Sequence, residues 1–513
     1  MWGLLPLSVL IGGVVSGRVS VARAGLAAVL VTGVLGALVY GAGPGVLAVA
    51  LGKGLWLGVW ISFVVVPALL LFRIAMAGGL AKTGIVFERV SDRPREQVLL
   101  VAWLGASLFQ GVAGFGAPIA ITAPLLLAMG ISAVRAVTYP LVGYCWSVTF
   151  GSMATSYYTA VVTSGADAAT IARFTLLVAV LLGGLAVLSG LAVAAMDGGW
   201  DGVRRSFAFV VVVGVPMAGV LVLVALVAPA VASTAAAATG IVIAAVYCRV
   251  RARLQRRPRH RGEPGELRQG LLVLLPYGAL VVILLTVFLV PVWQDWIDHG
   301  AVLGFSFPET TTGRGWVNAA AEPYRPMPLL SHPGTYLLLV CAFAVVLFRR
   351  TRIWQGPSVR TVLVDWLRAT PKAAAPVIVF AVFALLLTDT GMIQDVARVI
   401  SSLFGSHVLL IAPIIGALGS FLTGSSTSSN AVFAPLQAQA AGLAGVDQGF
   451  ALAGQAAGAN VGNSTAPVVI TVGASTVGAE HAGREILVRV APWAGGLLLV
   501  LLVCGAVFDR IGG

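Results

Sequence analysis

The chain consists mainly of long apolar runs separated by short polar segments. Several runs reach the roughly 20 residues that a helix needs to cross a bilayer, and they are continuously apolar rather than alternating, which predicts membrane helices and not barrel strands. The runs lie near 1–17, 24–48, 55–76, 97–109, 117–130, 137–163, 171–195, 207–230, 232–248, 270–292, 334–348, 374–390, 398–418, 431–446, 450–474 and 487–508. Because the pattern around 97–130 and 419–446 is too short or too broken for full crossings, we predict about 12 to 14 spans with re-entrant or broken helices there.

Four polar or glycine-rich stretches interrupt this apolar pattern. They are QGVAGFGAP (110–118), FGSMATS (150–156), TGSSTSSN (423–430) and GNSTAP (462–467). An unpaired backbone group in hydrocarbon costs several kcal/mol, so unwound backbone is tolerated only where protein or a water-filled cavity satisfies it. Small and hydroxyl residues can also serve close helix packing, which is the alternative explanation for any single one of them. The six consecutive polar residues from Ser425 to Asn430 instead favour a role in binding a ligand.

The interruptions occur twice in the same order. Ala123-Pro124-Leu125 recurs as Ala434-Pro435-Leu436, and Gly151 recurs as Gly462, both 311 positions later. Paired interruptions at corresponding places in two halves are typical of transporters built from repeats, with the binding site between them. The predicted domains are an N-terminal repeat (1–248), a cytoplasmic basic linker (249–269) and a C-terminal repeat (270–513).

Charge is scarce and lies mainly in the segments between apolar runs. Only 10% of the 513 residues are charged and the mean hydropathy is +0.99, which indicates an integral membrane protein. The formal net charge is +13. Residues 249–268 and 349–372 are rich in Lys and Arg, whereas 293–333 holds more acids than bases, so the positive-inside rule places the first two in the cytoplasm and the third outside. This distribution explains the basic balance without a nucleic-acid partner.

The sequence offers no pattern of catalytic chemistry. The four cysteines are scattered through apolar segments without metal-ligand spacing, and the five histidines lie in or near loops without forming a cluster. No phosphate-binding loop and no nucleophile-base pair is recognisable. We therefore expect neither an enzyme, nor a cofactor, nor a metal site.

Two motifs resemble those of a known family. FQGVAGFGAPIAITAPLLLAMG (109–130) and FLTGSSTSSNAVFAPLQA (421–438) resemble the signatures of the lactate permease family, and MDGGWDGVRRSF (196–207), SHPGT (331–335) and VGAEHAGREILVRVAP (477–492) fit in order. The resemblance implies a multi-pass plasma-membrane carrier that takes up L-lactate or glycolate with protons. The wider grouping of the family implies an all-α fold of two inverted repeats with re-entrant hairpins and an elevator-like mechanism. The oligomeric state is left open, with a homodimer among the options.

Three positions depart from the family pattern. Gln110, Ser426 and Asn463 stand where the family usually has Glu, Asp and Lys, so each replaces an ionisable group by a neutral one. Charged residues inside a membrane normally bind the coupling ion or the substrate. Their loss indicates an altered coupling ion, an altered substrate, or both. Proton symport of a 2-hydroxymonocarboxylate is the leading hypothesis. A sodium-coupled carrier of another organic anion is the alternative, and an ion channel is the alternative from another class.

The resemblance and the interruptions together indicate the site. The expected substrate-binding residues are Gly114, Phe115, Gly116, Ala117, Pro118, Ser425, Ser426, Thr427, Ser428, Ser429, Asn430, Asn463, Ser464 and Thr465. The candidates for holding the coupling ion, H⁺ or Na⁺, are Gln110, Ser152, Thr155, Asn430 and Asn463. Backbone amides at half-helix starts, together with hydroxyl and amide donors, would hold the carboxylate of a small organic anion.

Overall fold

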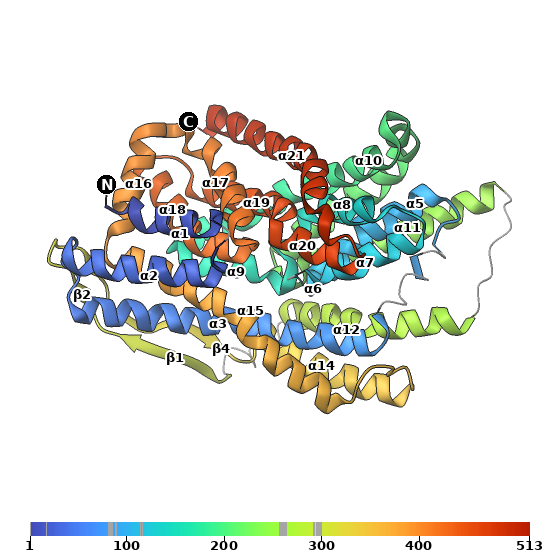
Figure 1. Cartoon of the computed structure of the whole chain (residues 1–513), viewed down its shortest axis with the longest axis horizontal. Helices are drawn as coiled ribbons and strands as arrows, with labels where there is room; N and C mark the ends of the chain where they lie inside the picture. Colours follow the sequence, from blue (N-terminus) through green and yellow to red (C-terminus); the bar gives the residue numbers. More distant parts are fainter. Residues whose placement is uncertain are drawn as a thin grey trace.

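The computed structural model shows an almost entirely helical protein (Figure 1). It describes all residues except 1, 17, 81–85, 88–89, 113, 115, 256–263, 291–292, 294–299 and 513. The N-terminal part forms α1 (Leu4–Val15), α2 (Val21–Leu38), α3 (Pro44–Ala77), α5 (Pro94–Leu99), α6 (Ala106–Val112), α7 (Ala117–Ala128), α8 (Ala133–Gly143), α9 (Gly151–Ser164), α10 (Ala168–Ala225) and α11 (Ala232–Leu254). The C-terminal part forms α12 (Pro264–Leu289), β1 (Val302–Phe307), β2 (Thr310–Thr311), β3 (Val317–Asn318), β4 (Ala321–Pro328), α14 (Pro333–Arg350), α15 (Val359–Asp389), α16 (Met392–Phe404), α17 (Val408–Thr423), α18 (Ser426–Ala444), α19 (Gln448–Thr465), α20 (Pro467–Thr476) and α21 (Gly483–Gly512).

The helices confirm the predicted all-α membrane class. Within the described residues, nine helices are long and apolar enough to cross a membrane. The longest, α10, contains a break at Gly198 and Gly199, between two of the predicted spans. The expected 12 to 14 crossings also count shorter and broken segments, and that number stays a prediction. The only strands of the described part pair antiparallel, β1 with β4 and β2 with β3, within the segment 293–333.

Both predicted breaks are helical hairpins in the structure. α6 and α7 meet at tip 1, residues 112–117, where Gly116 has a left-handed φ of 87°. α17 and α18 meet at tip 2, residues 423–426, where Gly424 has a φ of 69°. A residue with a side chain adopts this conformation at a cost, so glycine marks where the helix direction reverses.

Two groups of helices lie side by side (Figure 1). α2, α3, α12, α14 and α15 gather along one side, at the bottom of Figure 1, and both hairpins lie in the other group with α8, α9 and α19. α3 packs along α15. In addition, α14 packs against α3, and α2 packs against α15. Lys53 of α3 and Asp389 of α15 form a buried ion pair, with 3.2 Å between Nζ and Oδ2. Asp389, the last residue of α15, is therefore paired within the first group.

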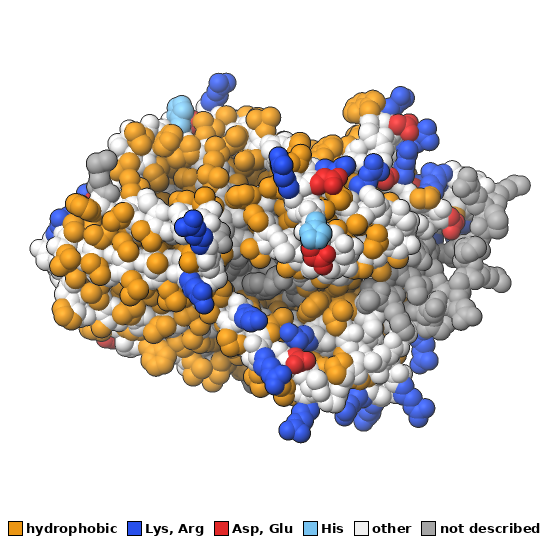
Figure 2. All heavy atoms as spheres, viewed as in Figure 1, with side chains coloured by type: hydrophobic (Ala, Val, Ile, Leu, Met, Phe, Trp, Pro, Cys, Tyr) orange, Lys and Arg blue, Asp and Glu red, His pale blue; other side chains and the backbone are white. Residues whose placement is uncertain are grey.

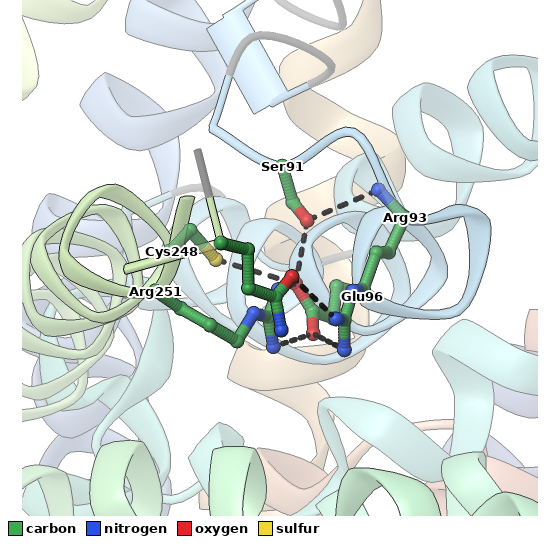
Figure 3. A network of polar contacts seen from close by, with 6 residues as sticks. Ser91, Arg93, Glu96, Cys248 and Arg251 are labelled. Carbon is green, nitrogen blue, oxygen red and sulfur yellow. Dashed lines mark hydrogen bonds and ion pairs between the residues drawn. The ribbon is translucent and has the colours of Figure 1, made fainter. Parts of the chain in front are cut away.

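A second buried ionic cluster ties α5 to α11 (Figure 3). Both guanidinium nitrogens of Arg251 bind the two carboxylate oxygens of Glu96, and Ser91 Oγ donates to the same carboxylate. Cys248 Sγ lies 3.4 Å from Glu96 Oε2, and Arg93 reaches across to Gln255 at 3.0 Å. Burial by itself raises the pKa of Glu96, but the hydrogen bonds from Arg251 and Ser91 outweigh it and hold this pKa below its usual value of 4.5. The cluster fixes the chain that leads into tip 1.

Candidate functional site

A cavity of about 170 Å³ lies between the two hairpin tips. Residues from α6, α9, α18, α19 and α20, from both tips and from the connection after α8 form its wall. The lining residues are Gln110, Gly116, Tyr144, Val148, Gly151, Ser152, Ser156, Gly424, Ser425, Ser426, Thr427, Asn463, Val468, Val469 and Val472. One side of the wall is therefore polar, and the valines of α20 form an apolar side.

Three helices begin at this cavity. Gly116 precedes the first turn of α7, Ser425 precedes that of α18, and Val468 belongs to the first turn of α20. The first amides of a helix have no intrahelical partner, and the helix dipole places partial positive charge at that end. Each N-terminus favours an anion by about 0.3–1 kcal/mol in exposed settings and by more when buried. Their convergence makes the cavity electropositive without any cationic side chain.

Tip 1 is fixed by an unusual turn at the start of α9. Ser152, Met153 and Ala154 all have left-handed backbone, with φ of 48°, 57° and 58°. This conformation costs roughly 1–2 kcal/mol per residue. It places Ser152 Oγ where it accepts a hydrogen bond of 2.8 Å from the amide of Gly114. A β-carbon on Gly114 would lie 2.0 Å from this oxygen, which explains the glycine.

Tip 2 is held from α19 and by its own hydroxyl groups. Ser425 Oγ accepts from the amide of Ser428 at 3.2 Å and caps α18. Thr423 Oγ1 donates to the carbonyl of Ser425 at 3.0 Å. Asn463 Nδ2 donates to the carbonyl of Gly424 at 3.3 Å, so Asn463 both fastens the tip and lines the cavity.

Asn430 lies behind the cavity wall rather than in it. Its side chain is fully buried, and Nδ2 donates to the carbonyl and hydroxyl oxygens of Ser156 at 3.1 and 3.0 Å. Gln455 Nε2 donates to Asn430 Oδ1 at 3.4 Å and to Ser429 Oγ at 3.2 Å. Because Ser156 lines the cavity, this network connects the wall to the packing of α18 on α19.

The structure separates the predicted residues into two groups. Those that line the cavity are Gln110, Gly116, Ser152, Ser425, Ser426, Thr427 and Asn463. Those next to it or behind it are Gly114, Ala117, Pro118, Thr155, Ser428, Ser429, Asn430, Ser464 and Thr465. Phe115 lies outside the described residues. The site residues expected from the sequence did not include Tyr144, Val148, Gly151, Ser156, Gly424 and the three valines of α20. Of these, Gly151, Ser156 and Gly424 carried a signal, as parts of the breaks FGSMATS and TGSSTSSN.

The cavity holds neutral polar groups. None of its lining residues among the described part of the chain carries a charge. The side chains of Gln110, Ser426, Thr427 and Tyr144 make no hydrogen bond to any described residue, which leaves them available to a ligand. The described residues contain no group of three or more His, Cys, Asp or Glu that could hold a metal. The arrangement can bind and release a small anion, and its lining contains no nucleophile activated by a base.

Comparison with known proteins gives one family. The L-lactate permease family matches residues 1–508. An L-lactate permease of Streptococcus iniae is 25% identical over 403 residues, covering 76% of this chain and 79% of that protein. The glycolate permease GlcA of Escherichia coli K12 is 25% identical over 477 residues, covering 85% of this chain and 82% of that protein.

A solved structure of Neisseria gonorrhoeae MtrF matches with a TM-score of 0.43 and 14% identity, over 88% of this chain and 81% of that one. A likeness at this level carries no conclusion. The family match over nearly the whole chain, with the membrane-spanning helices, identifies a multi-pass plasma-membrane transporter and not an enzyme. The chain belongs to the L-lactate permease family.

Proposed function

We propose that the protein is a secondary carrier that imports a small organic anion, a 2-hydroxymonocarboxylate such as L-lactate or glycolate. The observation that carries the proposal is the convergence of three helix N-termini on a neutral cavity. A volume of about 170 Å³ leaves room for a ligand of a few non-hydrogen atoms, such as lactate. The names of the relatives agree with this substrate class.

The bound anion would use both sides of the cavity. The carboxylate would face the first amides of α7 and α18 and the hydroxyl groups of Ser426 and Thr427. The 2-hydroxyl group needs a donor and acceptor, which the amide of Gln110 or the hydroxyl of Tyr144 supplies. The valines of α20 would cover the remaining carbon. This division explains why the wall is polar on one side only.

The coupling ion is proposed to be a proton, as in the family resemblance. The lining contains no side chain that titrates between pH 5 and 8, so the proton would travel on the substrate carboxyl group or on a group outside the cavity. Sodium is the second candidate. Hydroxyl, amide and carbonyl oxygens around Ser426, Asn463 and Gly424 are ligands that a hard cation accepts.

We infer that residues 1–248 and 270–513 are two inverted repeats joined by 249–269. Shifting α2, α3, α7 and α9 by the 311 positions found in the sequence makes them overlap α14, α15, α18 and α20. Thr149 Oγ1 donates to Asn460 Oδ1 at 2.7 Å, and these two residues are 311 positions apart. Equivalent residues meet each other only near a two-fold axis, which supports the repeat. An elevator-like movement of the hairpin group against the α3–α15 group follows as a proposal.

Uptake by purified protein in liposomes tests the function. Labelled lactate, glycolate, acetate and a dicarboxylate would each be offered under an imposed proton gradient, an imposed sodium gradient, or neither. Saturable accumulation of lactate or glycolate above equilibrium, driven by one of the gradients, is expected. Protein-free liposomes are the control. Flux that equilibrates without saturating would instead favour a channel, and accumulation of the dicarboxylate alone would remove the assigned substrate class.

A further inference from the structure

A second and larger cavity, of about 810 Å³, lies beside tip 2. Its walls come from three places in the chain. The end of α1 and the segment that leads into α2 contribute Val15 and Val19, and α15 contributes Lys372 and Ala375. Helix α17 contributes Phe421, and α20 contributes Val468. The cavity is therefore built where the two groups of helices face each other, and it is separate from the polar cavity between the tips.

The walls of this second cavity are aliphatic and aromatic. Apart from Lys372 and Ser20, its lining residues are valines, alanines, prolines, Phe421 and Leu422. Water finds few hydrogen-bond partners in such a cavity, whereas a hydrocarbon chain can fill it favourably. Val15, Ala375 and Val468 are also exposed, so the cavity opens to the surface of the molecule. An occupant needs an apolar body.

Basic residues lie in the wall of this cavity and next to it in the sequence. Lys372 lines it, and Arg18 and Arg23 flank the lining segment 19–22. None of these three is in an ion pair within the described part of the chain, and no acidic residue lines the cavity. Figure 2 shows Lys and Arg side chains set singly into the apolar surface over the ends of α1 and α2 and over α15. The occupant therefore needs a negatively charged head.

We propose that this cavity binds one anionic phospholipid. The head-group phosphate lies against Lys372, Arg18 and Arg23, and the acyl chains lie against Phe421, Leu422 and Val468. Lys372 ends the segment 349–372, which is expected to be cytoplasmic, and the cytoplasmic leaflet is where anionic lipids concentrate. Val468 lines both cavities, so the lipid packs against the outer wall of the anion site. The lipid site itself does not depend on the proposed substrate.

Lipid retention measures the site directly. The wild type, Lys372→Glu and Arg360→Glu would be purified, reconstituted into nanodiscs of equal phosphatidylglycerol and phosphatidylcholine, extracted into detergent, and analysed by native mass spectrometry. Arg360 is exposed on the same helix but does not line the cavity, so it controls for the change in net charge. Thermal unfolding shows whether each variant is folded.

We expect the wild type and Arg360→Glu to retain one phosphatidylglycerol in preference to phosphatidylcholine. A basic residue near a membrane contributes about 1 kcal/mol, or about fivefold, so Lys372→Glu should reduce retention by at least that factor. Equal retention by Lys372→Glu, or no preference for phosphatidylglycerol in the wild type, overturns the proposal.

A second variant tests the cavity instead of its charge. Ala375→Trp places a large side chain in the cavity and leaves Lys372 unchanged. It should lose phosphatidylglycerol to a similar extent. If Ala375→Trp stops anion uptake but retains the lipid, the cavity is a passage for substrate and the lipid assignment is wrong.

Discussion

Gln110 is one of the three positions where a neutral side chain stands in place of the ionisable residue expected from the family resemblance. Its buried amide lines the cavity between the tips, close to Gly114 and Gly151, at a position where the family resemblance leads us to expect a glutamate. An amide keeps the same charge at every pH, whereas a carboxylate changes with its proton. In this chain, the position can bind substrate without making binding depend on pH.

Gln110→Glu should make uptake pH-dependent. Burial favours the neutral carboxyl group, which resembles the amide, so uptake near pH 5 should stay close to that of the wild type. As the pH rises and the group ionises, it repels the anion, and initial rates should fall by up to about tenfold per pH unit. Liposome uptake between pH 5 and 8 measures this. Gln355→Glu, at an exposed position, is the control, and an unchanged profile in Gln110→Glu would place residue 110 off the ion and substrate path.

Asn463→Ala and Asn430→Ala should each abolish uptake, for different reasons. The first removes the hydrogen bond that fastens tip 2 together with a cavity amide. The second leaves Ser156 and Gln455 without their buried partner, which costs about 1–3 kcal/mol of folding stability. Uptake and thermal unfolding would be measured with Ser475→Ala, an exposed change on α20, as control. Normal uptake by both asparagine variants would contradict the site.

Helix α17 meets α19 through glycines. A β-carbon on Gly458 would lie 2.0 Å from the carbonyl oxygen of Pro413, and one on Gly462 would lie 2.0 Å from that of Ala417. Backbone atoms cannot move aside as a flexible side chain can. These glycines therefore set the distance between the two helices, and with it the position of Asn463 beneath tip 2.

Gly458→Ala should lower stability by about 1–3 kcal/mol, as overpacking does. Gly495→Ala is the matched control, because a β-carbon there meets nothing within 4 Å and alanine favours a helix over glycine. The midpoint of thermal unfolding in detergent should fall for the first variant and stay or rise for the second. Equal midpoints would show that α17 and α19 separate without cost.

At the scale of the molecule, the Glu96 cluster joins α11 to the chain that enters tip 1. The folded state holds the pKa of Glu96 below its usual 4.5, so the unfolded state takes up the proton first as the pH falls. The stability from this carboxylate is thus fully present at neutral pH and is lost below about pH 4.5. Acid should loosen this cluster between α5 and α11.

Arg251→Ala should destabilise the protein by about 3–5 kcal/mol at pH 7, because it leaves Glu96 buried without its main partner. Glu96→Gln with Arg251→Met should recover much of this loss and should remove the sensitivity to acid below about pH 4.5. Thermal unfolding at pH 7 and at about pH 3.5 compares the variants. A double variant as unstable as Arg251→Ala would show that packing, and not the unpaired charge, is responsible.

The orientation of the whole chain remains a prediction from charge. Tags inserted in 249–268 and 349–372 should be accessible only from the cytoplasm, and a tag in 293–333, which contains β1 to β4, only from outside. Labelling of cysteine tags in intact cells and in inverted vesicles distinguishes the two sides. Cytoplasmic labelling of 293–333 would reverse the topology.

The sequence by itself determined the membrane class, the two breaks and the residue types at their tips. Unpaired backbone groups are so costly in hydrocarbon that a helix break needs suitable residues at the break itself. Here these residues are the glycines at 114 and 116 and the hydroxyl residues from 425 onward. The departures at Gln110 and Asn463 were equally visible, and both line the cavity.

Only the tertiary structure decided which of these side chains face the cavity. Ser426 and Asn430 belong to one polar run, yet Ser426 lines the cavity whereas Asn430 lies behind it, because Asn430 lies one turn, about 6 Å, further along α18, where this helix packs on α9 and α19. Tyr144 and Val468 carry no local signal, since an aromatic or aliphatic residue in an apolar chain is ordinary. Their place depends on contacts between segments more than 300 residues apart, which no local pattern encodes.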